Sequence, residues 1–271
     1  MSARAAAGGG PSLRVEHRKG VAWLRMNRPD SLNSLDAGLK EELITALEVA
    51  AGDHAVRAVA LTGAGRGFCV GQDLRELRDA YSAGESPDFA ALLERYYVPV
   101  IRLLTGMAKP TVAVVNGVAA GAGMSLALAC DLRLAASTAR LRLAFSGIAL
   151  VPDAGATWHL PRLVGLSKAM EIALLGDWVD ADEALRVGLV NRVYPSEELA
   201  DRAEEVLVAL AAGPTLALAG TKELLRANVD RDLAQALAAE GQGQAAAGRT
   251  KDHLEGVRAF LDKRPPEFLG A

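Results

Sequence analysis

Two apolar runs of strand length place the strongest constraint on how this chain folds. They are VRAVALTG (56–63) and TVAVVNGVAAG (111–121), and each carries few polar side chains. A strand with one face in water alternates polar and apolar residues, whereas a run that is apolar throughout indicates a strand covered on both faces of its sheet. A stretch of helical pattern at 88–107 can supply such cover. The pattern predicts an α/β protein.

The rest of the chain fits around this sheet. Residues 12–27 alternate apolar and polar residues about a central Arg-Lys-Gly, which predicts a β-hairpin. Residues 37–52 place leucines at helical spacing and predict a helix that ends near Gly52. Further strands are expected at 130–138 and 143–152, further helices at 154–165 and 166–176, and almost wholly helical structure after residue 180.

The length of the chain limits its number of domains, and its net charge limits the kinds of partner that it can bind. Its 271 residues are divided into a disordered N-terminal tail (1–12), an α/β core (13–200) and a helical C-terminal region (201–271). A net charge of −3 provides no global positive field for binding nucleic acid or an anionic membrane. We therefore expect a small-molecule partner, with any phosphate contact made locally.

The cysteines and the hydropathy pattern indicate a cytoplasmic protein. Cys69 and Cys130 lie far apart and match no metal-ligand spacing, which is typical of reduced thiols. No group of histidines and carboxylates has the spacing of a metal site, so no metal is expected. The first residues lack the apolar segment of a signal peptide, and no run approaches the roughly 18 apolar residues of a membrane helix.

Two glycine-rich turns are candidates for binding an anion or an oxyanion. LTGAGRGFCVGQDL (61–74) follows a strand and includes Arg66, but its spacing fits neither the dinucleotide fingerprint nor the P-loop. NGVAAGAGMSLALACD (116–131) leads into a helix, whose first amides are free donors. One amide from each turn can clamp a carbonyl oxygen that becomes negative in a transition state. The alternatives are a tight loop for the first turn and close helix packing for the second.

A third turn, GIALVPDAGATWH (147–159), sets a single carboxylate at the end of an expected apolar strand. An ion in that place costs several kcal/mol unless it is solvated, paired or used in chemistry. Asp153 fits the N-cap of a helix that begins near Ala154, and it also fits a catalytic acid/base. His159 fits a helix residue better than a base, so Asp153 stands alone as the acid in a glycine-rich setting.

Four motifs in this order resemble the crotonase, or enoyl-CoA hydratase/isomerase, superfamily. They are MNRPDSLNSLD, GAGRGFCVGQDL, NGVAAGAGMSLALACD and IALVPDAGATWHLPRLVG, and the likeness spans about residues 13–268. GRGFCVGQDL, LVPDAGATW and GVRAFLDKRPPEF are most similar to the isomerases that act on ring-1,2-epoxyphenylacetyl-CoA. The resemblance implies a spiral core of ββα units, with C-terminal helices that assemble a homotrimer or a dimer of trimers.

The resemblance also implies the catalytic groups. Two backbone amides of the family bind the thioester oxygen and stabilise an enolate, and they match the N–H groups of Gln72 and Ala122. The two glutamates of hydratases correspond to Ser125 and Phe145, neither of which is an acid. Asp153 matches an aspartate that several isomerases and a dehalogenase place at this turn. We expect Asp153 to carry a proton between carbon atoms in a dry site, where Phe145 helps to raise its pKa.

Coenzyme A is expected as part of the substrate, with no permanently bound cofactor. By resemblance, the segment 28–32 and the turn 63–68 hold its adenine and pantetheine, while Phe260 and Lys263 of a neighbouring subunit approach the nucleotide. Solvated surface charge is the alternative for the basic residues. The residues expected to contact substrate or coenzyme A are Arg28, Ser31, Leu32, Gly63, Gly65, Arg66, Phe68, Gly71, Asp73, Leu74, Arg75, Gly121, Ser125, Phe145, Trp158, Phe260 and Lys263.

The function expected from this resemblance is that of a cytoplasmic acyl-CoA isomerase. It shifts a double bond in a 3-enoyl-CoA or opens the ring epoxide of 2-(1,2-epoxy-1,2-dihydrophenyl)acetyl-CoA, through an enolate held in the oxyanion hole. A hydratase or hydrolase of the same fold and a non-catalytic acyl-CoA-binding protein are the alternatives. The acyl group, and with it a role in phenylacetate catabolism or in fatty acid metabolism, stays open.

Overall fold

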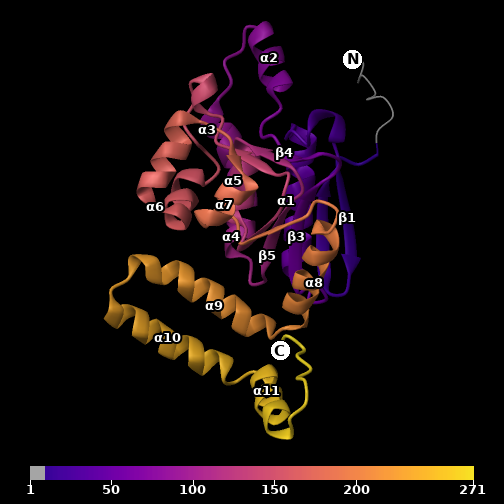
Figure 1. The fold of residues 1–271 in the computed structure, drawn as a ribbon, viewed down its shortest axis with the longest axis vertical. Helices are drawn as coiled ribbons and strands as arrows, with labels where there is room; N and C mark the ends of the chain where they lie inside the picture. Colours follow the sequence, from indigo (N-terminus) through magenta and orange to yellow (C-terminus); the bar gives the residue numbers. More distant parts are fainter. Residues whose placement is uncertain (1–9) are drawn as a thin grey trace.

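The strands form two β-sheets in the computed structural model, which describes residues 10–271 (Figure 1). The strands are β1 (Leu13–Arg18), β2 (Val21–Met26), β3 (Ala58–Gly63), β4 (Gly67–Cys69), β5 (Thr111–Val115), β6 (Val118–Ala120), β7 (Leu132–Ala136), β8 (Arg140–Arg142), β9 (Val179–Asp180) and β10 (Arg192–Tyr194). The larger sheet has the order β1-β2-β3-β5-β7-β10 and the smaller sheet β4-β6-β8-β9. Residues 1–9 of the expected tail lie outside the described residues.

The predicted hairpin and the two apolar runs build the larger sheet. β1 and β2 pair antiparallel, whereas β2, β3, β5, β7 and β10 run parallel to one another. Every residue of β3 and β5 is buried, which confirms the prediction of strands covered on both faces. The second run is divided at Asn116 and Gly117, so that β5 enters the larger sheet and β6 the smaller one.

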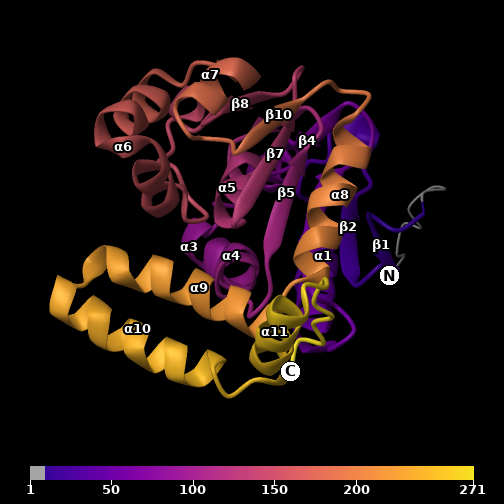
Figure 2. The ribbon, with the colours of Figure 1, turned by 60° about the horizontal axis from the view of Figure 1, so that its bottom comes forward.

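Helices lie against the sheets and extend beyond them (Figure 2). They are α1 (Ala37–Gly52), α2 (Leu74–Ser82), α3 (Phe89–Leu92), α4 (Val98–Gly106), α5 (Ala122–Ala129), α6 (Ala156–Leu175), α7 (Ala181–Arg186), α8 (Leu199–Ala212), α9 (Thr215–Ala227), α10 (Leu233–Ala247) and α11 (Lys251–Asp262), with a π-helical turn at Leu93–Tyr97 between α3 and α4. α1 contacts β1 and β2, α5 contacts β5, and α8 contacts β2, β3, β5 and β7. The expected boundary at residue 200 therefore falls within a helix that packs on the sheet.

The chain repeats a ββα unit, as the resemblance implies. The units β3-β4-α2, β5-β6-α5 and β7-β8-α6 each send a first strand to the larger sheet and a second strand to the smaller one. β4, β6 and β8 pair in parallel, so their carboxyl ends lie at the same edge of the smaller sheet. The first two turns identified in the sequence contain β4 and β6, and the third turn follows β8, so each is connected to this edge of the smaller sheet.

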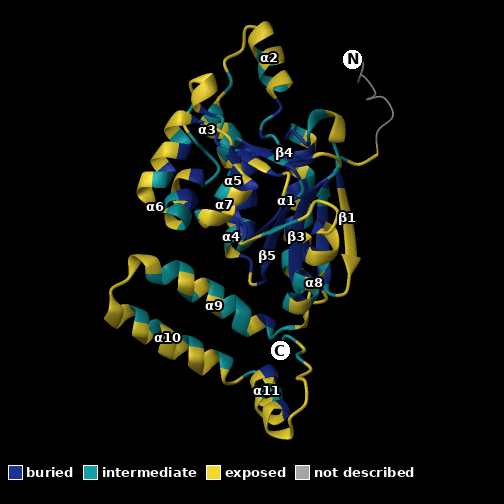
Figure 3. Ribbon diagram, in the orientation of Figure 1, coloured by how far each residue is buried: buried dark blue, intermediate teal, exposed yellow. Residues whose placement is uncertain are grey.

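The last three helices stand apart from the sheets (Figures 1 and 2). α9 is fastened to the core by Lys222 and Arg226, which form ion pairs of 2.9 Å with Asp131. Much of α10 and α11 is exposed, with Leu233 and Phe260 at 75% and 82% of their full exposure (Figure 3). The helical C-terminal region thus presents apolar side chains that this single chain does not cover.

One predicted strand is wrong, and four short strands, β4, β8, β9 and β10, were not predicted. Residues 143–152 form a loop with a 3-10 turn at Ser146–Ile148, and Ala149 in that loop has a φ of 56°, which an extended strand does not allow. Val151 is 80% exposed, so the apolar composition of this segment does not reflect burial in a sheet. β10 lies in the stretch that was expected to be almost wholly helical.

Both cysteines are buried free thiols, and burial raises the pKa of each to about 12. Residues 10–271 contain no cluster of three His, Cys, Asp or Glu side chains that could hold a metal ion. None of the described helices is by itself long and apolar enough to cross a membrane, although α8 and α9, bent by 102°, pass that test as a pair.

Candidate active site

The first and second glycine turns touch each other. Gly71 follows β4 with a φ of +87°, and a methyl group there would lie 3.0 Å from both the Ala120 carbonyl oxygen and the Ala122 amide nitrogen. Glycine allows both this backbone conformation and this close approach. The structure therefore brings Gln72 and Ala122 together at the ends of the paired strands β4 and β6.

The amides of Gln72 and Ala122 are available to bind an oxygen atom. Ala122 is the first residue of α5, where the amides lack partners within the helix and the helix dipole is positive. Within residues 10–271, neither amide donates a hydrogen bond to another backbone group. Two free donors from adjoining turns are the arrangement that stabilises an oxyanion.

Asp153 lies in the loop that leads into α6, and its carboxyl group lacks a partner. Its Oδ1 atom is buried and makes no hydrogen bond among the described residues. α6 begins at Ala156 with Gly155 as its N-cap and no side-chain capping bond, so the alternative in which Asp153 caps this helix is wrong. Burial raises the pKa of Asp153 to about 6, which suits a group that exchanges protons near neutral pH.

Tyr97 is a buried residue that bonds to the first turn. It is 2% exposed, and burial, with a smaller contribution from the negative charge of Asp153, raises its pKa far above the ordinary value. Its hydroxyl donates a hydrogen bond of 2.8 Å to Gln72 Oε1. Tyr97 therefore stays protonated and directs its proton to Gln72.

The two positions that correspond to hydratase glutamates hold no acid. Ser125 is fully buried in α5, and its hydroxyl donates to the Gly121 carbonyl oxygen at 3.3 Å. Phe145 is also buried, at 6% exposure. Neither residue offers a carboxylate that could orient a water molecule.

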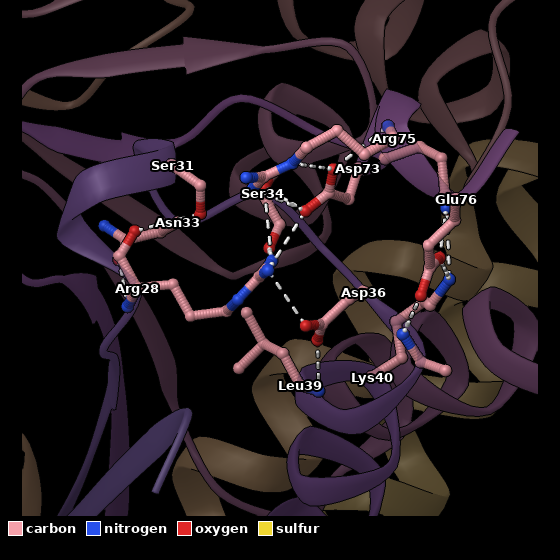
Figure 4. Close-up of polar contacts among 12 residues, drawn as sticks. Arg28, Ser31, Asn33, Ser34, Asp36, Leu39, Lys40, Asp73, Arg75 and Glu76 are labelled. Atoms are coloured by element: carbon pink, nitrogen blue, oxygen red, sulfur yellow. Dashed lines mark hydrogen bonds and ion pairs between the residues drawn. The ribbon is translucent and has the colours of Figure 1, made fainter. Parts of the chain in front are cut away.

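Three side chains hold the side chain of Gln72. Its Oε1 accepts hydrogen bonds from the Tyr97 hydroxyl at 2.8 Å and the Lys40 ammonium at 3.0 Å, and its Nε2 donates to Glu76 Oε2 at 2.8 Å. Glu76 also accepts from the Ala37 amide at 2.8 Å and pairs with Lys40 at 3.4 Å (Figure 4). The Glu76 carboxylate is thus bound by three donors of the protein, unlike the Asp153 carboxyl group.

A second polar cluster ties the segment before α1 to the start of α2 (Figure 4). Arg28 forms ion pairs with Asp73 at 3.0 Å and Asp36 at 2.9 Å, and Ser34 and Arg75 each donate to Asp73 at 3.0 Å. Burial alone would raise the pKa of Asp73, but the bonds from Arg75, Arg28 and Ser34 together hold that pKa well below its ordinary value. The charges of Arg28 and Asp73 are thus paired with each other inside the protein. The sequence instead predicted that both residues contact the substrate or coenzyme A.

The expected coenzyme A turn is part buried and part exposed. Phe68 is fully buried in the core, so its side chain offers no surface to a ligand. Gly63 is also buried, whereas Gly65 and Arg66 form an exposed tip. Leu32, whose side chain packs on Gly67, and Ser31 are half-buried beside this turn.

The resemblance implies that Trp158 contacts the substrate and that Phe260 and Lys263 reach the nucleotide on a neighbouring subunit. The Trp158 ring packs against the Arg162 guanidinium, 4.1 Å from the ring centre, and edge-on against His159. Phe260 and Lys263 are exposed at the end of α11, and this helix and α2 lie at opposite ends of the molecule (Figure 1).

A cavity of about 540 Å³ opens between α2 and the loop that precedes Asp153. Leu74, which is two residues after Gln72, lies in one wall, and Leu150, three residues before Asp153, lies in another. Largely apolar cavities of this size hold small ligands or acyl groups. The lining residues are Leu74, Leu77, Arg78, Tyr81, Ser82, Phe89, Ile148 and Leu150.

Sequence reasoning missed Lys40, Glu76 and the hydroxyl of Tyr97. Their contacts depend on α1, α2 and the π-helical turn meeting in space, which spacing within one element does not reveal. One signal was present: Lys40 falls in the apolar stripe of its helix, next to Leu39 and three residues before Leu43, both of which are buried. A lysine in such a stripe indicates a buried partner.

Known proteins resemble the chain along nearly its whole length. Residues 16–271 match the family model described as enoyl-CoA hydratase/isomerase. The chain is 43% identical over 252 residues to the 1,2-epoxyphenylacetyl-CoA isomerase of Escherichia coli, covering 93% of this chain and 96% of that protein. It is 36% identical over 258 residues to the 2,3-dehydroadipyl-CoA hydratase of the same organism, covering 95% and 98%. A crystal structure of an enoyl-CoA hydratase from Bacillus anthracis matches with a TM-score of 0.90 at 34% identity, covering 96% and 100%.

Proposed function

The chain belongs to the enoyl-CoA hydratase/isomerase family and is an enzyme that acts on CoA thioesters; from this premise we propose that it is an isomerase in which Asp153 moves a proton between two carbon atoms of the acyl group. The observation that carries the proposal is the Asp153 carboxyl group, which has a pKa of about 6 and one buried oxygen without a hydrogen-bond partner in the described part of the chain. The amides of Gln72 and Ala122 are the proposed oxyanion hole.

The reaction follows from these groups. With a 3-enoyl-CoA, the Asp153 carboxylate takes a proton from the carbon next to the thioester, and the electron pair moves onto the thioester oxygen to give a dienolate. The two amides hold that charge, and a single donor of this kind contributes about 2.7–4 kcal/mol. Protonated Asp153 then returns the proton to the γ carbon, and the double bond moves into conjugation with the thioester.

The distribution of carboxylates favours isomerisation over hydration. A proton shuttle needs one acid/base, whereas hydration also needs groups that orient a water molecule. Ser125 and Phe145 supply no carboxylate for that purpose, and the Glu76 carboxylate is occupied by three donors. Asp153 is therefore the proposed acid and base of the site.

Hydration is the second candidate, because a relative named 2,3-dehydroadipyl-CoA hydratase is 36% identical over 95% of the chain. In that reaction Asp153 would activate a water molecule that attacks a conjugated double bond. The same oxyanion hole would serve both reactions.

The cavity beside α2 is the proposed acyl site. Tyr81 and Phe89 give it flat apolar surface that suits a ring as well as a chain. The relative at 43% identity is named a 1,2-epoxyphenylacetyl-CoA isomerase. We therefore propose 3-enoyl-CoA and ring-1,2-epoxyphenylacetyl-CoA as substrates, the second of which belongs to phenylacetate catabolism.

Coenzyme A and the assembly are proposed together. The segment 28–32 and the exposed tip of the turn 63–68, at Gly65 and Arg66, would hold coenzyme A of the same chain, while Phe260 and Lys263 would reach the nucleotide on a neighbouring subunit. The exposed apolar residues of α9–α11, such as Leu225, Leu233 and Leu237, supply surface for a trimer or a dimer of trimers. Such an enzyme would work in the cytoplasm, without a bound cofactor.

The test compares the purified parent with its Asp153→Asn form on two substrates. Conjugation of 3-enoyl-CoA, followed by absorbance, is expected in the parent, and the substitution should lower its kcat by about 10²–10⁴-fold because an amide cannot shuttle the proton. Asp79→Asn, at an exposed aspartate of α2, is the matched control and should leave the rate unchanged. Brisk hydration of crotonyl-CoA by the parent would instead establish the second candidate.

A further inference from the structure

We infer that Lys40 and Tyr97 are positioning residues that clamp the side chain of Gln72 and so hold its backbone amide in place as an oxyanion donor. The inference rests on the proposed function only in that the Gln72 amide binds the thioester oxygen. Neither residue needs to touch the substrate, because both act through Gln72.

The contacts fix the Gln72 side chain at both ends of its amide group. Oε1 accepts from Tyr97 at 2.8 Å and from Lys40 at 3.0 Å, while Nε2 donates to Glu76 at 2.8 Å. A reversed amide would turn its N–H groups toward the Lys40 ammonium and its oxygen toward the Glu76 carboxylate, so one orientation is strongly preferred. The four residues come from α1, the start of α2 and the π-helical turn, and three elements therefore anchor one side chain.

The bonds from Lys40, Tyr97 and Glu76 to Gln72 compensate for the flexibility of the backbone at Gly71. Gln72 follows Gly71, whose φ of +87° and close approach to Ala120 and Ala122 favour glycine. Glycine also has the greatest backbone freedom, and a donor displaced by about 1 Å can cost about 100-fold in rate. Anchoring the side chain restricts the amide that glycine would otherwise leave free.

The buried position of Lys40 costs free energy of folding. It is 2% exposed, and burial lowers its pKa, while the Glu76 carboxylate opposes that shift. Its ammonium lies 4.8 Å from the centre of the Tyr96 ring and 5.8 Å from that of Tyr97. A buried ammonium costs free energy even when it is paired, so a role at the oxyanion hole accounts for it better than stability does.

The test measures kcat, KM and the pH dependence of the parent, Tyr97→Phe, Lys40→Met and the double variant. Each single substitution is expected to lower kcat by about 10-fold with KM nearly unchanged, because the misplaced amide loses contact chiefly with the transition state. The kcat of the double variant should fall by a smaller factor than the product of the two single-variant factors, because both donors bind the same atom, Gln72 Oε1. Tyr96→Phe is the matched control: among the described residues the Tyr96 hydroxyl bonds only to the exposed Glu41, at 3.4 Å, and the variant should keep the parental kcat.

Two results would overturn the assignment. One is a Tyr97→Phe enzyme with the parental kcat. This result would count against the clamp even if Lys40→Met does not fold. The other is a fall in kcat with the acid limb of the pH profile displaced by a full unit, which would mean that the hydroxyl acts on Asp153 instead of Gln72. Variants are compared with the parent in whichever reaction the parent catalyses, since isomerisation and hydration both need the thioester oxygen held. A failure of the proposed isomerase function is therefore seen in the parent, separately from a failure of this inference.

Discussion

Asp73 and Asp153 each lie in a loop that connects a strand of the smaller sheet to a helix, yet the surroundings of their carboxyl groups are opposite. Asp73 accepts hydrogen bonds from Arg28, Ser34 and Arg75, which hold its pKa well below the ordinary value. Asp153 has a buried oxygen with no partner among residues 10–271, and burial raises its pKa to about 6. Donors brought by distant segments, and not the local motif, decide which carboxylate holds the structure and which is left reactive.

The two carboxylates affect stability with opposite sign. Asp73 has a depressed pKa, so it contributes stability above the ordinary pKa of an aspartate and loses that contribution in acid. Asp153 has a raised pKa, so its contribution is complete below about pH 4 and is lost as the pH rises through about 6. A site that carries a destabilising charge at neutral pH is typical of a functional residue.

The largest effect on stability is expected where the paired aspartate is removed. Asp73→Ala leaves the partly buried Arg28 with one carboxylate fewer and takes away the side-chain cap of α2. The free energy of unfolding at pH 7 should fall by about 3 kcal/mol, as measured by urea denaturation.

The exposed Asp79 is the control for that measurement. Its ion pair with Arg78 lies in solvent, with both side chains more than 60% exposed, so Asp79→Ala should change stability by less than about 0.5 kcal/mol. Equal effects at the two positions would contradict the structural role assigned to the Asp73 cluster.

A smaller effect of the opposite sign is expected at Asp153. Asp153→Asn keeps the shape and removes the charge, so its stability relative to the parent should rise by about 1–2 kcal/mol between pH 4 and pH 8. A shift of two pKa units would give about 3 kcal/mol, and the partial exposure of the carboxyl reduces that figure. Urea denaturation of both proteins at the two pH values measures the change; a constant difference would mean that Asp153 is solvated or paired.

The smallest effect concerns the response of Asp153 to salt. The kcat/KM of the parent for 3-enoyl-CoA should decline below about pH 6, because Asp153 must be ionised to accept the proton. Since burial causes the shift, raising the salt concentration from about 0.05 to 0.5 M should move this limb by less than about 0.3 pH unit. An acid limb near pH 4, or one that moves strongly with salt, would remove the distinction between the two aspartates.

Local pattern was enough for much of the fold. The hairpin at 12–27, the buried strands β3 and β5, the helix α1 and the two predicted helices that meet in α6 at the non-helical Gly165 follow from alternation, apolar runs and helical spacing. The prediction of a strand at 143–152 was wrong because apolar composition does not distinguish a buried strand from a loop that lines a cavity. The short strands β8 and β10 carry too few residues to show a periodicity of their own.

The sequence by itself determined the residue types at the site: glycines that permit close turns, a lone Asp153, and no acid at positions 125 and 145. Only the tertiary structure decided that Gly71 touches Ala122, that Asp153 has no hydrogen-bond partner within residues 10–271, and that Lys40 and Tyr97 hold Gln72. The physical reason is the distance along the chain over which each interaction acts. Backbone preference and periodicity act over a few residues, whereas burial and hydrogen bonding join groups such as Lys40 and Gln72, which are 32 positions apart and meet only when the sheets and helices have packed.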